Sequence, residues 1–183
     1  MKVLFHACCA PCSIHCSDAL AANGIQFDLF WYNPNIYPGE EYYFRLDAFW
    51  TFTENRKITA LIEEDHAAFN PDPKNPKGRC AFCYRLRLEK TALFAVKKGY
   101  DAFSTSLLIS PYQNHELLRQ IGAELADLYG VGFFYRDFRP GFRSGQKQAR
   151  EAGYYMQKYC GCNYSKKESV SPSAVVKTKQ GGK

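Results

Sequence analysis

Eight cysteines provide the strongest chemical signal in this sequence. They are Cys8, Cys9, Cys12, Cys16, Cys80, Cys83, Cys160 and Cys162. Only Val-Leu-Phe separates Lys2 from His6, which is too short for the apolar region of a signal peptide. We therefore expect a cytoplasmic protein with reduced thiols, in which clustered cysteines serve metal binding or redox chemistry.

Three of the cysteines stand in the dense run Cys8-Cys9-Ala10-Pro11-Cys12. Adjacent side chains of an extended segment point to opposite sides. Cys8 and Cys9 can therefore share a metal only if the backbone turns sharply or the metal body is large. An iron-sulfur cluster is large, whereas a single zinc suits C-x-x-C pairs such as Cys9 and Cys12. The local pattern leaves both metals open.

Cys80 and Cys83 form a second pair at the start of a predicted helix. Their spacing of three residues places them on one face of that helix. Arg79 and Arg85 flank the pair and favour a thiolate or a negatively charged cluster. If this pair meets the first group, four thiolates are available, for an iron-sulfur cluster or for a structural zinc ion.

The third group is Cys160-Gly161-Cys162. A disulfide between residues two apart has poor geometry, so it would be easily reduced and redox-active rather than structural. Binding of a second metal is the alternative for this pair. We expect Cys16 to be an inert core cysteine. We expect His6 to be packed or exposed to solvent, with a role as a nearby proton donor or as a group that supports a metal ligand as the alternative.

Apolar and amphipathic segments alternate along the chain and must position these cysteines. Apolar runs predict strands at 2–5, 27–32, 58–62, within 102–108 and at 131–135. Helical patterns are found at 13–22, 40–56, 80–97, 114–129, 145–152 and 155–159. This alternation predicts an α/β fold, a mainly parallel sheet with helices on both faces, followed by a C-terminal helical or loop segment that holds Cys-Gly-Cys. Ligands of such folds bind at the carboxyl ends of the strands, where the first strand leads into Cys8.

The net charge of +6 is unevenly distributed along the chain. Residues 166–183 contain five lysines and one glutamate, so we predict a basic, disordered tail after a single α/β metallo-domain at 1–165. Between Tyr135 and Arg150, arginines alternate with aromatic residues, a pattern that suits phosphate contacts and base stacking. A solvated loop anchored by phenylalanines is the alternative. No apolar run approaches the roughly 20 residues of a membrane helix, so we expect no membrane partner.

Together these motifs resemble the QueH family of epoxyqueuosine reductases, which complete queuosine in tRNA. The matching segments are 6–12, 33–36, 78–88, 110–113, 137–139 and 159–165, which extend over the whole predicted domain. The resemblance implies a HUP-like fold (adenine nucleotide α-hydrolase-like). It also implies a cobalamin-independent oxidoreductase that removes the epoxide oxygen of epoxyqueuosine as water, with two electrons.

The resemblance further implies a set of site residues. Cys8, Cys9, Cys80 and Cys83 hold a [4Fe-4S] cluster, while Cys160 and Cys162 are a redox-active pair or bind an additional iron ion, for which Cys12 is a candidate ligand. The residues expected to bind substrate and tRNA are Asn33, Asn35, Arg136, Asp137, Arg139 and Arg143. The expected partners are the anticodon stem-loop of a tRNA that carries epoxyqueuosine, and an electron donor.

Two other functions remain open from the sequence. One is a zinc-stabilised RNA-binding module without catalysis. The other is a tRNA sulfur-transfer enzyme. No glycine-rich loop that could bind phosphates follows the first strand, which argues against an ATP-dependent enzyme of the second kind.

Overall fold

The computed structural model of the chain describes residues 1–71, 75 and 78–170. The strands are β1 (Lys2–His6), β2 (Gln26–Trp31), β3 (Ala60–Ile62), β4 (Ala102–Thr105) and β5 (Gly132–Phe133). The helices are α1 (Ala10–Ala22), α2 (Gly39–Arg56), α3 (Arg79–Lys98), α4 (His115–Tyr129), α5 (Phe142–Glu151) and α6 (Asn163–Val170). Three 3₁₀ turns complete the order: η1 (His66–Ala68), η2 (Ser106–Ile109) and η3 (Arg139–Gly141).

All strand pairs of the five-stranded sheet are parallel, in the order β3-β2-β1-β4-β5. β1 is the central strand: Phe5 is paired with Leu29 on one side and with Ser104 on the other. Residues 3–6 of this strand are completely buried, as expected for a parallel strand covered on both faces. The predicted parallel α/β fold is confirmed, and the loops that follow β1, β2 and β4 meet at one edge of the sheet.

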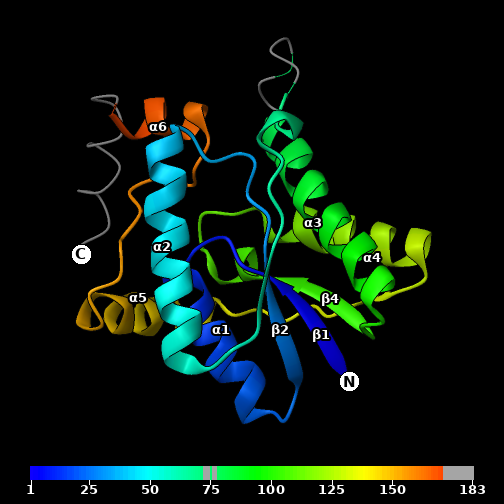
Figure 1. The fold of residues 1–183 in the computed structure, drawn as a ribbon. Coiled ribbons are helices and arrows are strands. Elements are labelled where there is room, and N and C mark those ends of the chain that lie inside the picture. Colours follow the sequence, from blue (N-terminus) through cyan, green and yellow to red (C-terminus); the bar gives the residue numbers. More distant parts are fainter. Residues whose placement is uncertain (72–74, 76–77, 171–183) are drawn as a thin grey trace, which may run out of the picture.

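Helices cover both faces of the sheet (Figure 1). α1, α2 and α5 gather on one side, and α3 and α4 lie on the other. Adjacent side chains of β2 explain this arrangement, since they point to opposite faces. Trp31 packs on Phe49 of α2 at 5.0 Å between ring centroids, whereas Phe30 packs on Phe94 of α3 at 4.8 Å. Aromatic packing therefore fixes both helical layers to one strand.

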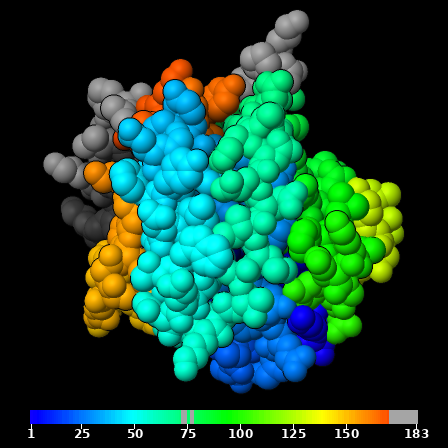
Figure 2. All heavy atoms as spheres, viewed as in Figure 1, coloured from blue at the N-terminus to red at the C-terminus, as the bar shows by residue number. Residues whose placement is uncertain are grey.

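The surface view shows how the segments around α2 cover the sheet (Figure 2). α2 and the segment that follows it cover the front of the sheet, and α6 lies beside the N-terminal end of α2. In the part of the chain that the structure describes, no helix is long and apolar enough to cross a membrane.

Several element boundaries differ from the sequence-based predictions. α1 begins at Ala10, three residues earlier than predicted, because the Cys9 sulfur caps the helix and Pro11 suits its first turn. The segment predicted as a strand within 102–108 becomes a short strand followed by η2. There the Thr105 hydroxyl accepts a hydrogen bond from the Leu107 amide and starts the turn.

The prediction of a helix at 155–159 is wrong, because that segment has no regular structure. Its polar groups form hydrogen bonds with the distant helix α2 instead. The predicted disordered tail also begins too early, since residues 166–170 belong to α6. The rest of that tail, 171–183, lies outside the described residues.

Candidate metal centre

Three cysteine sulfurs converge in the loop between β1 and α1. The Sγ atoms of Cys8, Cys9 and Cys12 all lie within 4.8 Å of one another, and all three side chains are buried. Two neighbouring loops hold this turn: the Cys8 amide donates to Ser106 Oγ at 2.9 Å, and Asn33 Nδ2 donates to the Ala7 carbonyl at 2.9 Å. The sharp turn that lets Cys8 and Cys9 face the same point is therefore present.

The three sulfurs differ in their protonation. Hydrogen bonds from the thiols of Cys12 and Cys9 hold the pKa of Cys8 well below its usual value. The bond to Cys8 raises the pKa of Cys12, and burial raises the pKa of Cys9. Cys8 is therefore the most acidic of the three thiols in the metal-free site. Since thiolate is the form that binds metals, metal binding must release the remaining protons.

The other candidate site cysteines stand on two further segments of the chain. Cys80 and Cys83 stand on the first turn of α3, where Cys83 is buried and Cys80 is exposed. Among the described residues, only Cys8, Cys9 and Cys12 form a group with the spacing of ligands around a single ion. Ligands of a four-iron cluster lie farther apart than that, so the predicted set of Cys8, Cys9, Cys80 and Cys83 stays a prediction.

Cys160 and Cys162 are free thiols whose Sγ atoms lie 3.9 Å apart, in the loop before α6. Gly161 between them has a φ of +130°, and a Cβ atom there would lie 2.9 Å from Asn35 Nδ2. This position therefore requires glycine. Hydrogen bonds from the Cys160 thiol and from Ser165 lower the pKa of Cys162 to about 5. The same pairing raises the pKa of Cys160.

We expect the metal-free, reduced protein to carry a thiolate at Cys162 at neutral pH. Because the folded-state pKa of about 5 lies below the usual thiol value, this thiolate forms as the pH rises through about 5 and is protonated below it. Thiolate absorbance in the ultraviolet, followed against pH, measures the step. Cys162→Ser should remove it, and Cys160→Ser should move it to higher pH. A step that persists in Cys162→Ser would contradict the assignment.

A buried ion pair that the sequence analysis missed anchors the Cys-Gly-Cys segment. Arg45 of α2 donates from Nε to Glu41 Oε1 at 2.7 Å. Its Nη1 and Nη2 donate to the carbonyls of Cys160, at 3.2 Å, and Tyr159, at 3.0 Å. Tyr155 Oη donates to the other Glu41 oxygen at 2.6 Å. These bonds take the place of helical bonds in the segment that was predicted to be a helix.

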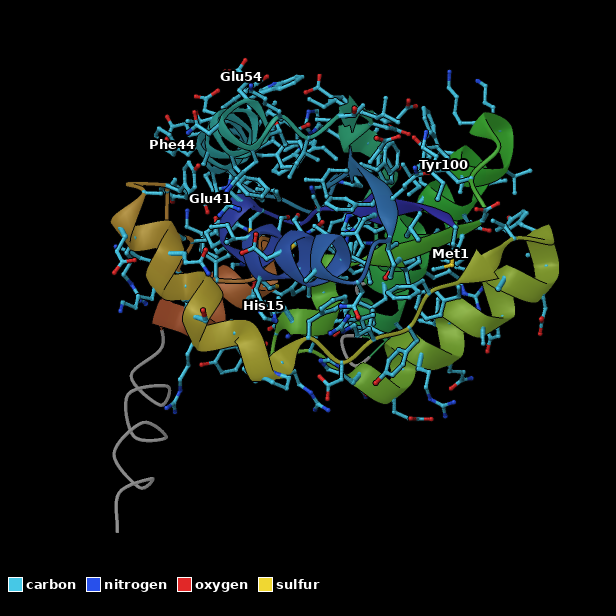
Figure 3. The ribbon with its side chains drawn as sticks, turned by 90° about the horizontal axis from the view of Figure 1, so that it is seen from below. Met1, His15, Glu41, Phe44, Glu54 and Tyr100 are labelled. Carbon is cyan, nitrogen blue, oxygen red and sulfur yellow. The ribbon has the colours of Figure 1, made fainter. Side chains whose placement is uncertain are left out.

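The side chain of Glu41 is directed toward the body of the molecule, while Glu54 lies on the outer side of the same helix (Figure 3). A signal for the pair was present in the sequence. Glu41 and Arg45 are four residues apart and therefore meet on one helix face. That face adjoins the apolar stripe of Tyr42, Leu46 and Phe49, all of which are buried.

Buried polar atoms without partners surround the sulfurs. Gln157 Nε2 donates to Cys9 Sγ at 2.8 Å, but Gln157 Oε1 has no partner among the described residues. The same holds for Asn33 Oδ1 and for both polar atoms of the Asn35 amide. Such atoms are costly in a dry core and are usually satisfied by a bound group or water. Sulfur donors lined by unsatisfied amides fit a metal centre.

His6 and Cys16 lie in the core close to this site. His6 Nδ1 is 2.9 Å from Thr105 Oγ1, and Nε2 is 3.1 Å from the Tyr32 carbonyl. Burial lowers the pKa of His6 to about 4, so the ring is neutral at physiological pH. Cys16 is fully buried in α1. Cys16 is packed in the core as predicted, and His6 is packed rather than exposed to solvent.

The residues predicted to bind tRNA fall into two places. Asn33 and Asn35 are buried next to the cysteines, so they do not lie on an open surface. The other four lie near or on α5, which packs with Gly145 against the Pro11 carbonyl of α1. There Arg136 donates to the Ala19 carbonyl at 3.4 Å, Asp137 and Arg139 form an ion pair, and Arg143 is exposed. Contact with tRNA by any of these six residues stays a prediction.

A cavity of about 480 Å³ lies beside the Cys-Gly-Cys segment. Asn35 and Tyr37 of the loop after β2 line it, together with Phe69 and with Tyr164 of α6. The Tyr37 amide donates to the Gly161 carbonyl at 2.8 Å, which joins the cavity wall to the dithiol. The aromatic rings and the volume suit a nucleobase.

Comparison of the sequence with known protein families identifies the family of this chain. The model of the family described as "Epoxyqueuosine reductase QueH" matches residues 3–168. The chain belongs to the QueH family. A protein of that name from Dehalococcoides mccartyi is 36% identical over 170 residues, covering 91% of this chain and 93% of the relative. The QueH protein of Thermotoga maritima is 35% identical over 195 residues, covering 98% and 97%.

Among solved structures, this QueH chain is similar to the U34-tRNA thiolase NcsA from Methanococcus maripaludis, solved with its [4Fe-4S] cluster. The TM-score is 0.56 at 15% identity, over 99% of this chain and 67% of that chain. At this identity the likeness concerns the fold alone, and it confirms the predicted HUP-like architecture. Membership of the QueH family confirms the predicted oxidoreductase class and the predicted place in queuosine biosynthesis.

Proposed function

We propose that this QueH chain reduces the epoxide of epoxyqueuosine in tRNA at a metal centre built on its N-terminal cysteines. One observation carries the proposal. The family model covers residues 3–168, and within that range three cysteines of the dense motif bring their sulfurs within 4.8 Å at the carboxyl edge of the sheet. The edge where parallel strands end is the usual ligand site of open α/β sheets.

The donor set defines the cofactor of this proposal. Cys8 and Cys9, together with Cys80 and Cys83, hold a [4Fe-4S] cluster in the proposed site. When bound, such a cluster supplies electrons one at a time. Soft sulfur donors, among which Cys8 has a lowered pKa, support this assignment. Cys12 remains available as a ligand of an additional iron.

Deoxygenation converts the epoxide to an alkene and water, and it consumes two electrons and two protons. Cys160 and Cys162 match the electron demand, because oxidation of the Cys160 thiol and the Cys162 thiolate to a disulfide releases two electrons and one proton. The second proton comes from solvent. The two cysteine sulfurs are 3.9 Å apart, and Ser165 Oγ lies 3.0 Å from Cys160 Sγ, so a proton-holding group stands next to the pair. Arg45 orients the pair by holding the carbonyl of Cys160. An electron donor must re-reduce the centre after each turnover.

The modified base enters the cavity next to the dithiol in this proposal. Tyr37, Phe69 and Tyr164 supply aromatic faces on which a base that has left the anticodon stack can lie. Tyr164 stands two residues after Cys162, so a base stacked there lies close to the reducing pair. The anticodon stem-loop then lies across the adjacent surface.

The exposed face of α5 is expected to contact the tRNA backbone. Arg143→Gln should weaken tRNA binding equally for all sequences and reduce the slope of log Kd against log salt by about one, because one phosphate contact is lost. Arg119→Gln is the matched control, since Arg119 is exposed on α4 and already paired with Glu116. Filter binding at several salt concentrations measures both slopes. Equal slopes for the two variants would place the tRNA elsewhere.

The activity test uses the full chain, reconstituted with iron and sulfide without air and supplied with dithionite. It is incubated with tRNA that carries epoxyqueuosine, and the nucleosides are analysed by mass spectrometry. We expect queuosine, one oxygen lighter than the substrate, from the iron-loaded protein and none from zinc-loaded protein. An iron-loaded, reduced protein that binds this tRNA but leaves the epoxide intact would refute the proposal.

A further inference from the structure

Arg87 is a buried cation that the proposed mechanism does not use. It stands on α3, one turn after Cys83, and its side chain is only 3% exposed. Its one hydrogen bond is long, from Nε to the Cys83 carbonyl at 3.4 Å. Among the described residues no carboxylate forms an ion pair with it. Arg45, the other buried arginine, has Glu41 as its partner.

Cysteines of three separate segments act electrostatically on this guanidinium, and Arg87 is bonded to the carbonyl of one of them, Cys83. Burial lowers the pKa of Arg87, but the negative forms of Cys83, Cys8 and Cys160 raise it by more. The first of these stands on the same helix, the second in the loop after β1 and the third in the Cys-Gly-Cys segment. His6 is also close, and it is neutral, since burial and then the charge of Arg87 lower its pKa to about 4.

A buried guanidinium is costly unless an anion compensates it, and an apolar side chain of similar size would pack at this place with less cost. Among the described residues that act on the charge of Arg87, Cys8 and Cys83 are buried thiols, and Tyr84 is a buried phenol whose pKa is raised by burial, so it stays neutral. Thiols become fully anionic when they bind a metal. The positive charge of Arg87 is therefore compensated only when these thiols are in their thiolate form.

We infer that Arg87 is the counter-charge of the metal centre: its guanidinium lies near Cys8 and Cys83 to compensate their metal-bound thiolates. It is a positioning residue, which touches neither the substrate nor its reacting atoms. The inference rests on the metal centre of the proposed function, and it does not depend on which substrate that centre reduces.

This role predicts that removing the charge of Arg87 has opposite effects on the stability of the metal-loaded and the metal-free protein. Without the positive charge, the thiolates and the reduced cluster lose compensation, so the centre is lost faster and is harder to reduce. The metal-free protein instead loses an unpaired buried charge, so it does not become less stable. A residue that served only to pack the core would weaken both states together.

The experiment compares Arg87→Met, Arg87→Lys and the control Arg85→Met in the full chain. Arg85 lies on the exposed side of the same helix, in an ion pair with Glu124. Metal-free protein is unfolded by heat. Reconstituted protein is assayed for iron, for the rate of iron loss to a chelator, and for the reduction potential by titration followed with electron paramagnetic resonance.

For Arg87→Met we expect an unchanged or higher unfolding temperature without metal. Iron loss to the chelator should be at least about tenfold faster, which corresponds to about 1.4 kcal/mol, and the potential should move to more negative values. Arg87→Lys should restore most of the potential, and Arg85→Met should match the parent protein. If Arg87→Met takes up no iron at all while its metal-free stability is kept, that loss supports the role as well.

Two results would overturn the inference. One is Arg87→Met with lower metal-free stability and an unchanged rate of iron loss and potential, which would make Arg87 a packing residue. The other is a parent chain that takes up no iron, since no anionic centre would then exist. A parent chain that loads iron and shows the Arg87 effects, yet leaves epoxyqueuosine intact, would refute the proposed reaction and keep this inference.

Discussion

Cys9→Ser is expected to abolish both the metal centre and turnover while leaving the fold intact. The Cys9 sulfur accepts hydrogen bonds from the Cys12 amide at 3.4 Å and from Gln157 at 2.8 Å. Serine keeps the helix-capping bond, because a hydroxyl is among the best caps, but it is a poor ligand for iron. Replacing a residue that holds a metal ligand in position lowers metal affinity about 10- to 100-fold, and replacing a ligand itself lowers it at least as much.

Iron and sulfide analysis after anaerobic reconstitution measures the first effect, and the tRNA assay measures the second. Cys16→Ala is the matched control. Cys16 lies on the same helix, is fully buried and has no part in the sulfur group. The Cys16→Ala variant should therefore retain its iron and its activity. A Cys9→Ser variant that holds as much iron as the Cys16→Ala control would remove Cys9 from the centre.

Arg45→Met is expected to lower the free energy of unfolding by about 3–5 kcal/mol, because it leaves Glu41 as an uncompensated buried charge. Globular domains are stable by only about 5–15 kcal/mol, so this is a large part of the total. The carbonyls of Tyr159 and Cys160 lose their donors in the same step. The dithiol segment should therefore detach, and reduction of the epoxide should be lost even where the variant is folded.

Urea unfolding followed by circular dichroism measures the change in stability. Arg56→Met is the control, since its ion pair with Asp18 at 2.8 Å is about 40% exposed on both sides and should contribute no more than about 1 kcal/mol. The double variant Glu41→Gln, Arg45→Met should recover part of the stability, because no buried charge is left unpaired, but not the activity. Equal losses for Arg45→Met and Arg56→Met would contradict this account of the buried pair.

Much of the fold could be predicted because its signals are local. Apolar runs such as 2–5 and 27–32 predict buried strands, and the stripe of Leu117, Ile121, Leu125 and Leu128 predicts one helix face. Of that stripe Ile121 and Leu125 are buried, whereas Leu128 is exposed. The alternation of strands and helices predicts a parallel sheet, since crossover helices must connect parallel strands. The position of Cys8 could be predicted as well, because a loop that follows the central strand lies at the carboxyl edge of the sheet.

The errors lie where distant contacts overrule a local pattern. Residues 155–159 carry a helical pattern, but Tyr155 bonds to Glu41, and Arg45 takes the carbonyl of Tyr159, so the segment is held open. The sulfur of Cys12 lies in one group with those of Cys8 and Cys9, which the sequence did not settle, and its role as a ligand of an additional iron stays a prediction. Helix α1 begins early enough to bring that sulfur back over the turn.

The order of strands and helices, the family and the cysteine-rich turn after the first strand could be predicted from the amino-acid sequence, because periodicity and motif spacing are properties of neighbouring residues. Tertiary structure alone decided which charges are buried and what faces them. Arg45 and Arg87 look like ordinary helix-surface arginines in the sequence, but both are enclosed by segments more than 70 residues away along the chain. Burial of this kind depends on which surfaces meet, and no local pattern records that.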